Sequence, residues 1–283
     1  MLFRSDRFTL IDGKLATPGI DPKDDWTLGN YYVYENGEWV THRRVPGGVH
    51  MFDVVEYDGA IFTGLGVVAG ESPVAASFDG GESFRQLPFI KKGETLDTTG
   101  RTYIRVYDFF VYEDTLYAAL SLEDGERVYA LYFYDPDKEA FVYEMDLTNV
   151  FERVAYKYSK IGEKVIFDGS LFLTTGRLYE TIDMLEFEKW EFPSGVAVTD
   201  LYVASDTLYA LTSGKDPESG QFKTTVYALA SSDGTFEPTF EFLYDVPAMS
   251  MVVDGNDFYI GMGNGRTVHE KNGTLLRVSL AEK

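Results

Sequence analysis

The sequence predicts an all-β fold: a six-bladed β-propeller built from four-stranded antiparallel blades. Tyr (20 residues) and Phe (21 residues) are abundant, and both favour strands. Asp-Gly and Asn-Gly pairs, which form tight hairpin turns, recur between short apolar runs. A hydrophobic residue follows each turn at intervals of 37 to 55 residues. This spacing is expected of propeller blades.

The repeat is clearest between Asp53 and Phe89. The segment DVVEYDGAIFTGLG contains two apolar runs joined by Asp-Gly, VAASF supplies a third strand, and RQLPF supplies a fourth. Six such repeats are expected because the second strand can be aligned on six hydrophobic residues: Leu15, Ile61, Leu116, Leu171, Leu208 and Phe258.

The outer two strands of five repeats are each expected to form a hairpin, over residues 30–45, 74–89, 127–146, 177–192 and 224–242. The sixth repeat, residues 273–283, supplies only a third strand. An open strand edge is unfavourable, so residues 2–5 are expected to pair there and close the ring. The whole chain, residues 1–283, is expected to form a single propeller domain.

Composition excludes several classes of partner. The formal net charge of −21 argues against nucleic acid and anionic membranes, because both are bound largely through Lys and Arg. Cysteine is absent, which excludes disulfides, thiolate metal sites and a cysteine nucleophile. No apolar stretch approaches the roughly 20 residues of a spanning helix. The compartment is left open, with an extracellular, cell-surface or virion-surface location slightly favoured.

One hairpin carries a complete motif. Ser77-Phe78-Asp79-Gly80-Gly81-Glu82-Ser83-Phe84 matches the pattern S-x-D-x-G-x-[ST]-[FW], and degenerate versions occur at residues 231–236 and around Asp135 and Asp183. The chain therefore resembles the Asp-box (BNR-repeat), sialidase-like superfamily of propellers. We interpret its motif residues as structural, because the Asp carboxylate can accept backbone N–H groups while the aromatic ring packs into the blade. These residues are Ser77, Asp79, Gly81 and Phe84.

The resemblance implies, for an active sialidase, three arginines that clamp a carboxylate, a Tyr/Glu nucleophile pair and an Asp general acid. Arg4, Arg105 and Arg266 are candidate arginines, and Tyr244 or Tyr259 is a candidate nucleophile. None of them lies in a recognisable motif. The sequence therefore assigns no catalytic residue.

A second regularity comes from the repeat alignment. Eight residues before the aligned hydrophobic residue, four repeats carry an acid: Asp53, Asp108, Glu163 and Asp200. Three residues before the first three acids stand basic residues: His50, Arg105 and Lys160. Two interpretations remain open. Each acid bonds the backbone of a neighbouring blade and holds the blades in register, or the seven residues form a ring at the funnel mouth that binds a ligand.

Neither a metal nor a cofactor is expected. His42, His50 and His269 are scattered along the chain. Residues 21–25 and 135–139 contain carboxylates suited to calcium but lack the spacing of a calcium-binding loop. Calcium is retained only as a minor alternative.

The sequence favours a non-catalytic binding module for a glycan or polar small ligand, held at the funnel mouth and rim loops. Aromatic faces can stack on sugar rings, and carboxylates can accept their hydroxyl groups. Two alternatives remain: a glycoside hydrolase or lyase that uses the funnel carboxylates, and an assembly scaffold for a protein partner. A monomer is expected. The longer loops that form the rim are expected at residues 17–28, 90–102, 149–158 and 213–223.

Overall fold

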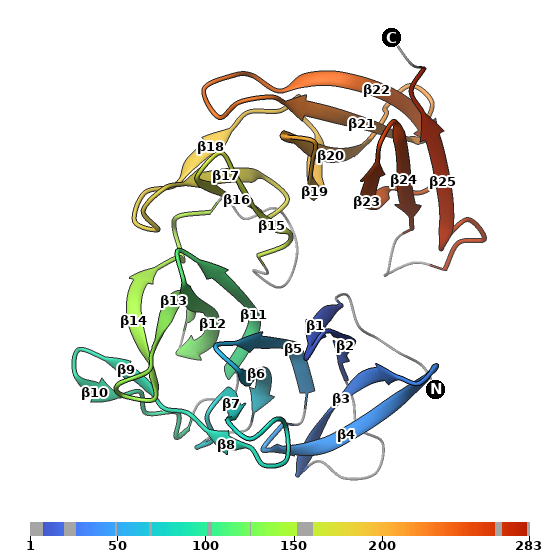
Figure 1. The fold of residues 1–283 in the computed structure, drawn as a ribbon. Coiled ribbons are helices and arrows are strands. Elements are labelled where there is room, and N and C mark those ends of the chain that lie inside the picture. Colours follow the sequence, from blue (N-terminus) through green and yellow to red (C-terminus); the bar gives the residue numbers. More distant parts are fainter. Residues whose placement is uncertain are drawn as a thin grey trace. The chain divides into compact units, whose positions relative to one another are not determined.

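The computed structural model describes residues 8–19, 27–48, 50–67, 70–100, 104–124, 126–151, 161–263 and 268–281 (Figure 1). Within these ranges the regular structure consists of strands, which confirms the all-β prediction. The described part of the chain contains no helix long and apolar enough to span a membrane. The chain divides into two compact units, Met1–Phe151 (unit 1) and Glu152–Lys283 (unit 2). Each unit is described by itself.

Unit 1 begins with a four-stranded antiparallel meander. Its strands are β1 (Thr9–Ile11), β2 (Lys14–Pro18), β3 (Leu28–Glu35) and β4 (Glu38–Pro46). Two further meanders follow. The second contains β5 (His50–Tyr57), β6 (Ala60–Val67), β7 (Val74–Ser77) and β8 (Arg85–Gln86). The third contains β11 (Ile104–Tyr112), β12 (Thr115–Asp124), β13 (Glu126–Asp135) and β14 (Ala140–Asp146).

The second and third meanders are parts of one ten-stranded sheet. Beyond Gly64, β6 no longer pairs with β7, and its end pairs with the start of β11 through Arg105↔Gly66 and Ile104↔Val67. The sheet is completed by a small hairpin, β9 (Phe89–Lys91) and β10 (Glu94–Thr95), of which β9 runs parallel to β14. The sequence predicts only a loop, residues 90–102, over most of this hairpin.

Unit 2 contains three meanders in separate sheets. The first contains β15 (Lys164–Phe167), β16 (Ser170–Thr174), β17 (Leu178–Thr181) and β18 (Glu188–Trp190). The second contains β19 (Val196–Ala204), β20 (Thr207–Lys215), β21 (Phe222–Leu229) and β22 (Glu237–Tyr244). The last has three strands among the described residues, namely β23 (Ala248–Asp254), β24 (Asp257–Met262) and β25 (Thr274–Ser279).

The predicted repeat matches these meanders. Each of the six aligned hydrophobic residues lies in the second strand of its meander, and the predicted outer hairpins fall on the third and fourth strands. The antiparallel four-stranded repeat is thereby confirmed. The predicted closing strand, residues 2–5, lies outside the described residues. A single domain and a closed six-bladed ring therefore stay predictions.

Tight turns set the register of the first hairpin in each meander. In the β5–β6 turn, Asp58 (φ 49°) and Gly59 (φ 71°) both adopt left-handed backbone conformations. Two consecutive residues with positive φ are typical of the type I′ turn that matches the twist of a two-residue hairpin. The β19–β20 turn repeats this conformation without glycine, at Ser205 (φ 49°) and Asp206 (φ 56°).

The core of unit 1 lies between its meanders and is strongly aromatic. Phe62 of β6 is fully buried, and its ring lies 4.8 Å from that of Tyr134 and 6.1 Å from that of Phe141. Both pairs are edge-to-face, the arrangement that aromatic quadrupoles favour. This packing joins the second meander to the third, and β5 and β11, which carry most of the predicted site residues of unit 1, belong to these two meanders.

Candidate functional site

A β-bulge precedes three of the four aligned acids. The pairing register shifts between Met51 and Asp53 in β5, between Val106 and Asp108 in β11, and between Val198 and Asp200 in β19. Each shift leaves one extra residue on the first strand: Phe52, Tyr107 or Thr199. A bulge redirects the side chains around it. The acid that follows is buried, with Asp53 3%, Asp108 1% and Asp200 6% exposed.

Two of these acids bond the next meander. Asp53 accepts hydrogen bonds from its neighbour Val54 N (3.0 Å) and from Phe109 N of β11 (2.8 Å). Asp200 accepts hydrogen bonds from Leu201 N (2.9 Å) and from Met251 N of β23 (2.5 Å). Both carboxylates thus join adjacent meanders through backbone N–H groups, as the register interpretation expects.

The other aligned residues are placed less completely. Asp108 takes the same position after the bulge in β11. Glu163 lies just before β15 and is partly exposed. Lys160 lies outside the described residues, as do Arg4 and Arg266. The hydrolase alternative needs two carboxylates that reach a substrate, and the burial of Asp53 and Asp108 argues against that role for them.

Burial gives Asp200 an unusual proton affinity. It raises the pKa of Asp200 from 3.8 to about 7, and the negative charge of Glu163 acts in the same direction. The two backbone N–H groups oppose this rise because they stabilise the carboxylate. Asp200 is therefore expected to titrate near neutral pH while it bonds β23.

The structure brings His50 and Arg105 together across one glycine. His50 of β5 and Arg105 of β11 are both cross-strand partners of Gly66, on opposite sides of β6. Between them lie the two aromatic bulge residues, with the Phe52 and Tyr107 ring centroids 4.6 Å apart. We call His50, Phe52, Arg105 and Tyr107 the basic-aromatic cluster.

The contacts within this cluster are specific. Arg105 Nη1 donates a hydrogen bond to the Tyr107 hydroxyl (3.1 Å), and the guanidinium carbon lies 5.4 Å from the Phe52 ring centroid. The His50 and Phe52 ring centroids are 6.0 Å apart. His50, Phe52 and Arg105 are partly exposed, whereas Tyr107 is 6% exposed. A cation, an imidazole and an accessible aromatic ring thus meet at one place.

Sequence reasoning identified His50 and Arg105 but missed Phe52 and Tyr107. The available signal was their position, since each directly precedes an aligned acid. That position alone does not indicate a site, because the bulge that brings the two rings together depends on pairing with the neighbouring strand. The candidate nucleophiles gain no support. Tyr259 contacts Arg277 (6.0 Å from ring centroid to guanidinium carbon), and Tyr244 packs against the core of unit 2.

The complete motif of the sequence, residues 77–84, forms a closed hydrogen-bonded turn between β7 and β8. Ser77 Oγ donates to Asp79 Oδ1 (2.7 Å) and accepts from Gly81 N (2.8 Å). Ser83 donates to Asp79 through its backbone N (2.9 Å) and its hydroxyl (2.5 Å). These hydrogen bonds lower the pKa of Asp79 to about 2. The Ser83 hydroxyl has the largest effect, followed by the Ser83 N–H and the Ser77 hydroxyl.

This turn packs onto the preceding meander. The Phe84 ring meets the buried Tyr31 ring edge-on at 6.0 Å. Gly81 has a left-handed φ of 91°, and a Cβ there would lie 2.7 Å from the Tyr31 hydroxyl. Arg44 of β4 donates to Gly81 O (3.3 Å) and pairs with Glu82 (2.6 Å). These contacts join the turn to the first meander.

A degenerate version of this motif occupies the same place between β17 and β18. Thr181 takes the role of the serine and accepts a hydrogen bond from Met184 N (3.0 Å). Asp183 accepts from Leu185 N (2.8 Å) and Glu186 N (3.0 Å), which holds its pKa below the ordinary value. The turn is one residue shorter than the complete motif.

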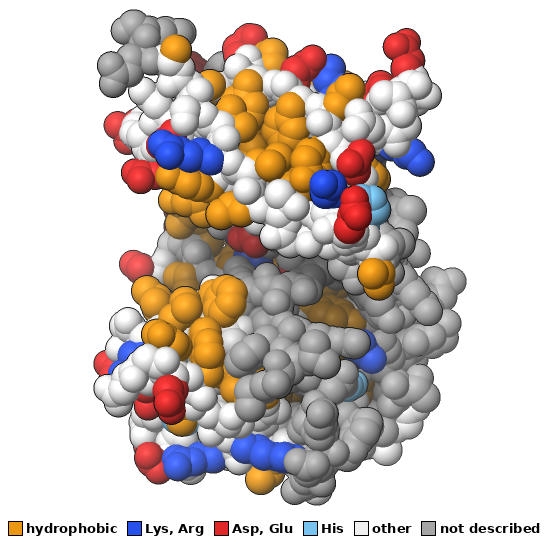
Figure 2. Space-filling view, turned by 90° about the vertical axis from the view of Figure 1, so that its right-hand side faces the viewer, with side chains coloured by type: hydrophobic (Ala, Val, Ile, Leu, Met, Phe, Trp, Pro, Cys, Tyr) orange, Lys and Arg blue, Asp and Glu red, His pale blue; other side chains and the backbone are white. Residues whose placement is uncertain are grey.

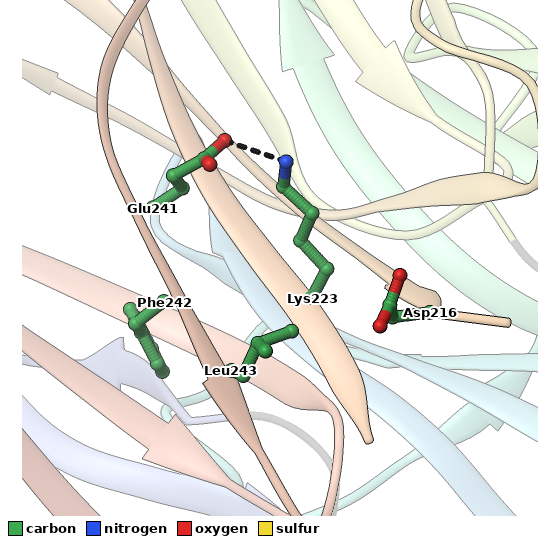
Figure 3. A pocket seen from close by; sticks show the side chains of 5 residues that line it. All are labelled: Asp216, Lys223, Glu241, Phe242 and Leu243. Carbon is green, nitrogen blue, oxygen red and sulfur yellow. Dashed lines mark ion pairs between the residues drawn. The ribbon is translucent and has the colours of Figure 1, made fainter. Parts of the chain in front are cut away.

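Unit 2 also has a surface groove of about 360 Å³, lined by Asp216, Lys223, Glu241, Phe242 and Leu243. In Figure 3, Lys223 and Glu241 point toward one another, and they form an exposed ion pair of 2.8 Å. Both side chains of this pair are exposed, and their charges neutralise one another. The groove is therefore a weaker candidate for a ligand site than the basic-aromatic cluster.

Apolar side chains also reach the surface of both units (Figure 2). In the first meander, Phe8 and Tyr34 are 60% and 44% exposed, and their rings lie 6.0 and 5.3 Å from that of Trp39. Within the described ranges, no group of three or more His, Asp or Glu side chains is placed to hold a metal ion.

Comparisons with known proteins concern the fold alone. No protein-family model matches the chain, and no curated protein matches its sequence, so the Asp-box resemblance has no family-level support. The chain is similar to a solved structure described as a polysaccharide lyase of family PL25, an ulvan lyase. The TM-score is 0.50 at 11% identity, with 89% of this chain and 75% of the lyase covered.

A second structure of that description, bound to -[GlcA(1-4)Rha3S]-, has a TM-score of 0.49 at the same identity and coverage. At 11% identity, the likeness to the first of these structures shows a shared arrangement of strands and nothing further. The chemistry of this chain must be argued from its own residues.

We expect Asp200→Asn to change the pH dependence of stability. The raised pKa means that the contribution of Asp200 is fully present below about pH 4 and is lost as the pH rises through about 7. The variant has no carboxyl group to titrate at this position. Relative to the wild type, its unfolding free energy should therefore rise by up to about 1.4 kcal/mol for each pH unit between about pH 4 and pH 7. Urea unfolding at pH 4, 5.5 and 7.5 measures the difference, and a constant difference would contradict the prediction.

We expect Asp79→Ala to lower the Tm at neutral pH without changing affinity for any glycan. The depressed pKa means that the contribution of Asp79 is present above about pH 4 and is lost as the pH falls through about 2. The gap in urea midpoint between variant and wild type should therefore narrow between pH 6 and pH 3. Loss of binding with an unchanged Tm would show that the motif is a ligand site.

Proposed function

We propose that the basic-aromatic cluster of unit 1 binds an acidic oligosaccharide. The observation that carries the proposal is the meeting of Arg105, His50 and the Phe52 ring around Gly66. A guanidinium pairs with a carboxylate through parallel N–H···O bonds, and an aromatic ring packs against the C–H face of a sugar. A sugar acid offers both groups on one ring.

The local charge matters because the whole chain is strongly acidic. A net charge of −21 repels an anion at long range. At physiological salt this repulsion is screened over about 8 Å, whereas a contact with Arg105 inside the cluster is screened much less. The ligand is therefore held by close contacts with the cluster.

The other aligned residues support this site indirectly. Asp53 fixes β5 to β11 through Phe109 N and so sets the spacing between Phe52 and Tyr107. We assign Asp53 and Asp200 to register between meanders. No catalytic step is required for binding.

A lyase is the second candidate, favoured by the hydrogen bond between Arg105 and Tyr107. In β-elimination a base removes the proton beside a uronate carboxylate, the bond from C4 to the leaving oxygen breaks, and a C4=C5 double bond forms. The leaving oxygen takes up a proton. A guanidinium stabilises the charge that develops on the carboxylate, and a tyrosine or histidine serves as acid or base. The cluster contains these groups.

We further infer that the six meanders are blades of one propeller, closed by pairing of residues 2–5 with the last meander. The inference is supported by six consecutive meanders and by the last one having three described strands where the others have four. The propeller would contain the whole chain as one domain.

We expect Arg105→Ala to weaken binding of a glucuronic-acid-containing oligosaccharide roughly tenfold or more, because it removes a charge-assisted contact. Phe52→Ala should weaken it several-fold. The control variant is Arg85→Ala, which removes another arginine over a phenylalanine ring, 4.8 Å from Phe78 and outside the cluster. The affinity of Arg85→Ala for the oligosaccharide should equal that of the wild type.

Isothermal titration with the oligosaccharide and its carboxyl-reduced form separates the outcomes. The reduced form should bind weakly to the wild type and should be insensitive to Arg105→Ala. Equal binding of both forms would contradict the proposed function. Growth of ultraviolet absorbance from an unsaturated product would decide for the lyase, and its absence alongside binding would decide for the binding module.

We expect deletion of residues 1–6 to lower the Tm and to speed amide hydrogen exchange in β25, because the deletion would leave an unpaired strand edge. Hydrogen exchange followed by mass spectrometry measures this for Thr274–Ser279. Exchange in β12, an interior strand of unit 1, is the internal control. Unchanged exchange in β25 would overturn the closure.

A further inference from the structure

We infer that Gly66 is a specificity-determining position of the basic-aromatic cluster, because its lack of a side chain creates the space in which the Phe52 ring lies. The inference rests on the proposed function. It goes beyond it by identifying the residue that converts a cationic site into one suited to a sugar ring.

Gly66 is not required by backbone conformation. It lies in β6 as a regular strand residue, and its φ is outside the left-handed region that favours glycine. The reason for glycine must therefore be spatial. A Cβ on Gly66 would lie 2.8 Å from Phe52 Cε2, 3.3 Å from Phe52 Cζ and 3.5 Å from His50 Cβ. The first distance is shorter than real Cβ contacts, so the Phe52 ring would have to move.

The position of Gly66 makes this movement specific. It is the cross-strand partner of both His50 and Arg105, so the ring above it lies between the two basic residues. The same ring contacts Tyr107 (4.6 Å) and Arg105 (5.4 Å). A sugar ring stacked on Phe52 would have its substituents within reach of Arg105. Displacing Phe52 would leave the cation in place but remove the surface that orients the sugar.

Gly64 provides a matched control two residues earlier on the same strand. A Cβ on Gly64 would lie 2.7 Å from the backbone oxygen of Val106 and 3.1 Å from its side chain. The backbone at Val106 cannot move aside as the Phe52 ring can. Gly64 therefore serves the packing of β6 against β11, whereas Gly66 faces the far end of one side chain.

The experiment measures affinity for the glucuronic-acid-containing oligosaccharide and the Tm in Gly66→Ala, Phe52→Ala, the double variant and Gly64→Ala. Gly66→Ala should lower affinity at least fivefold with a small change in Tm. The double variant should bind no more weakly than Phe52→Ala, because Gly66 acts through that ring. Gly64→Ala should lower the Tm clearly, while the protein that remains folded binds like the wild type.

The outcomes separate this inference from the proposed function. If the wild type does not bind the oligosaccharide, the proposed function fails and the role of Gly66 fails with it. If the wild type binds and Gly66→Ala binds equally well, only the role of Gly66 is overturned. Additive losses in the double variant would also overturn it, since Gly66 would then act independently of Phe52. Loss of the nuclear Overhauser contact between the Phe52 and Tyr107 rings in Gly66→Ala would support the inference without any ligand.

Discussion

The hydrogen bond that Phe109 N donates to the Asp53 carboxylate is the interaction on which the site in unit 1 depends. A buried carboxylate is costly unless donors surround it, and Asp53 obtains one donor from its own strand and one from the next meander. The bulge at Phe52 makes this reach possible. The same bulge turns the aromatic ring toward Tyr107, so one local irregularity positions both the joint between meanders and the candidate ligand surface.

Unit 2 contains the same kind of hydrogen bond between neighbouring meanders, but different side chains surround it. Asp200 bonds Met251 as Asp53 bonds Phe109, but its bulge residue is Thr199 and no aromatic pair forms there. Glu163 adds a second acid near Asp200, whereas in unit 1 Arg105 lies beside the Phe52 ring. The same kind of meander therefore carries a basic site in unit 1. In unit 2, the surroundings of the corresponding acid, Asp200, are acidic. This difference explains why repeat alignment alone could not identify the site.

Local signals predicted the strands well. Turns such as Asp58-Gly59 and the hydrophobic residue after each turn are determined by nearby sequence, so all six second strands were found. The pairing of β6 with β11 was not predictable, because it joins residues nearly forty positions apart. Phe52 and Tyr107 were missed because a bulge is defined by the partner strand. The β9–β10 hairpin was missed because its strands are too short to show alternation.

The shared strand β6 also has a mechanical consequence. Backbone hydrogen bonds run without interruption from the second meander into the third, whereas the three meanders of unit 2 form separate sheets. Tension applied to either of the two joined meanders would pass through peptide groups rather than through side-chain packing. These two meanders should open together as one cooperative block, and the candidate ligand surface, which spans their junction, should persist until that block is lost.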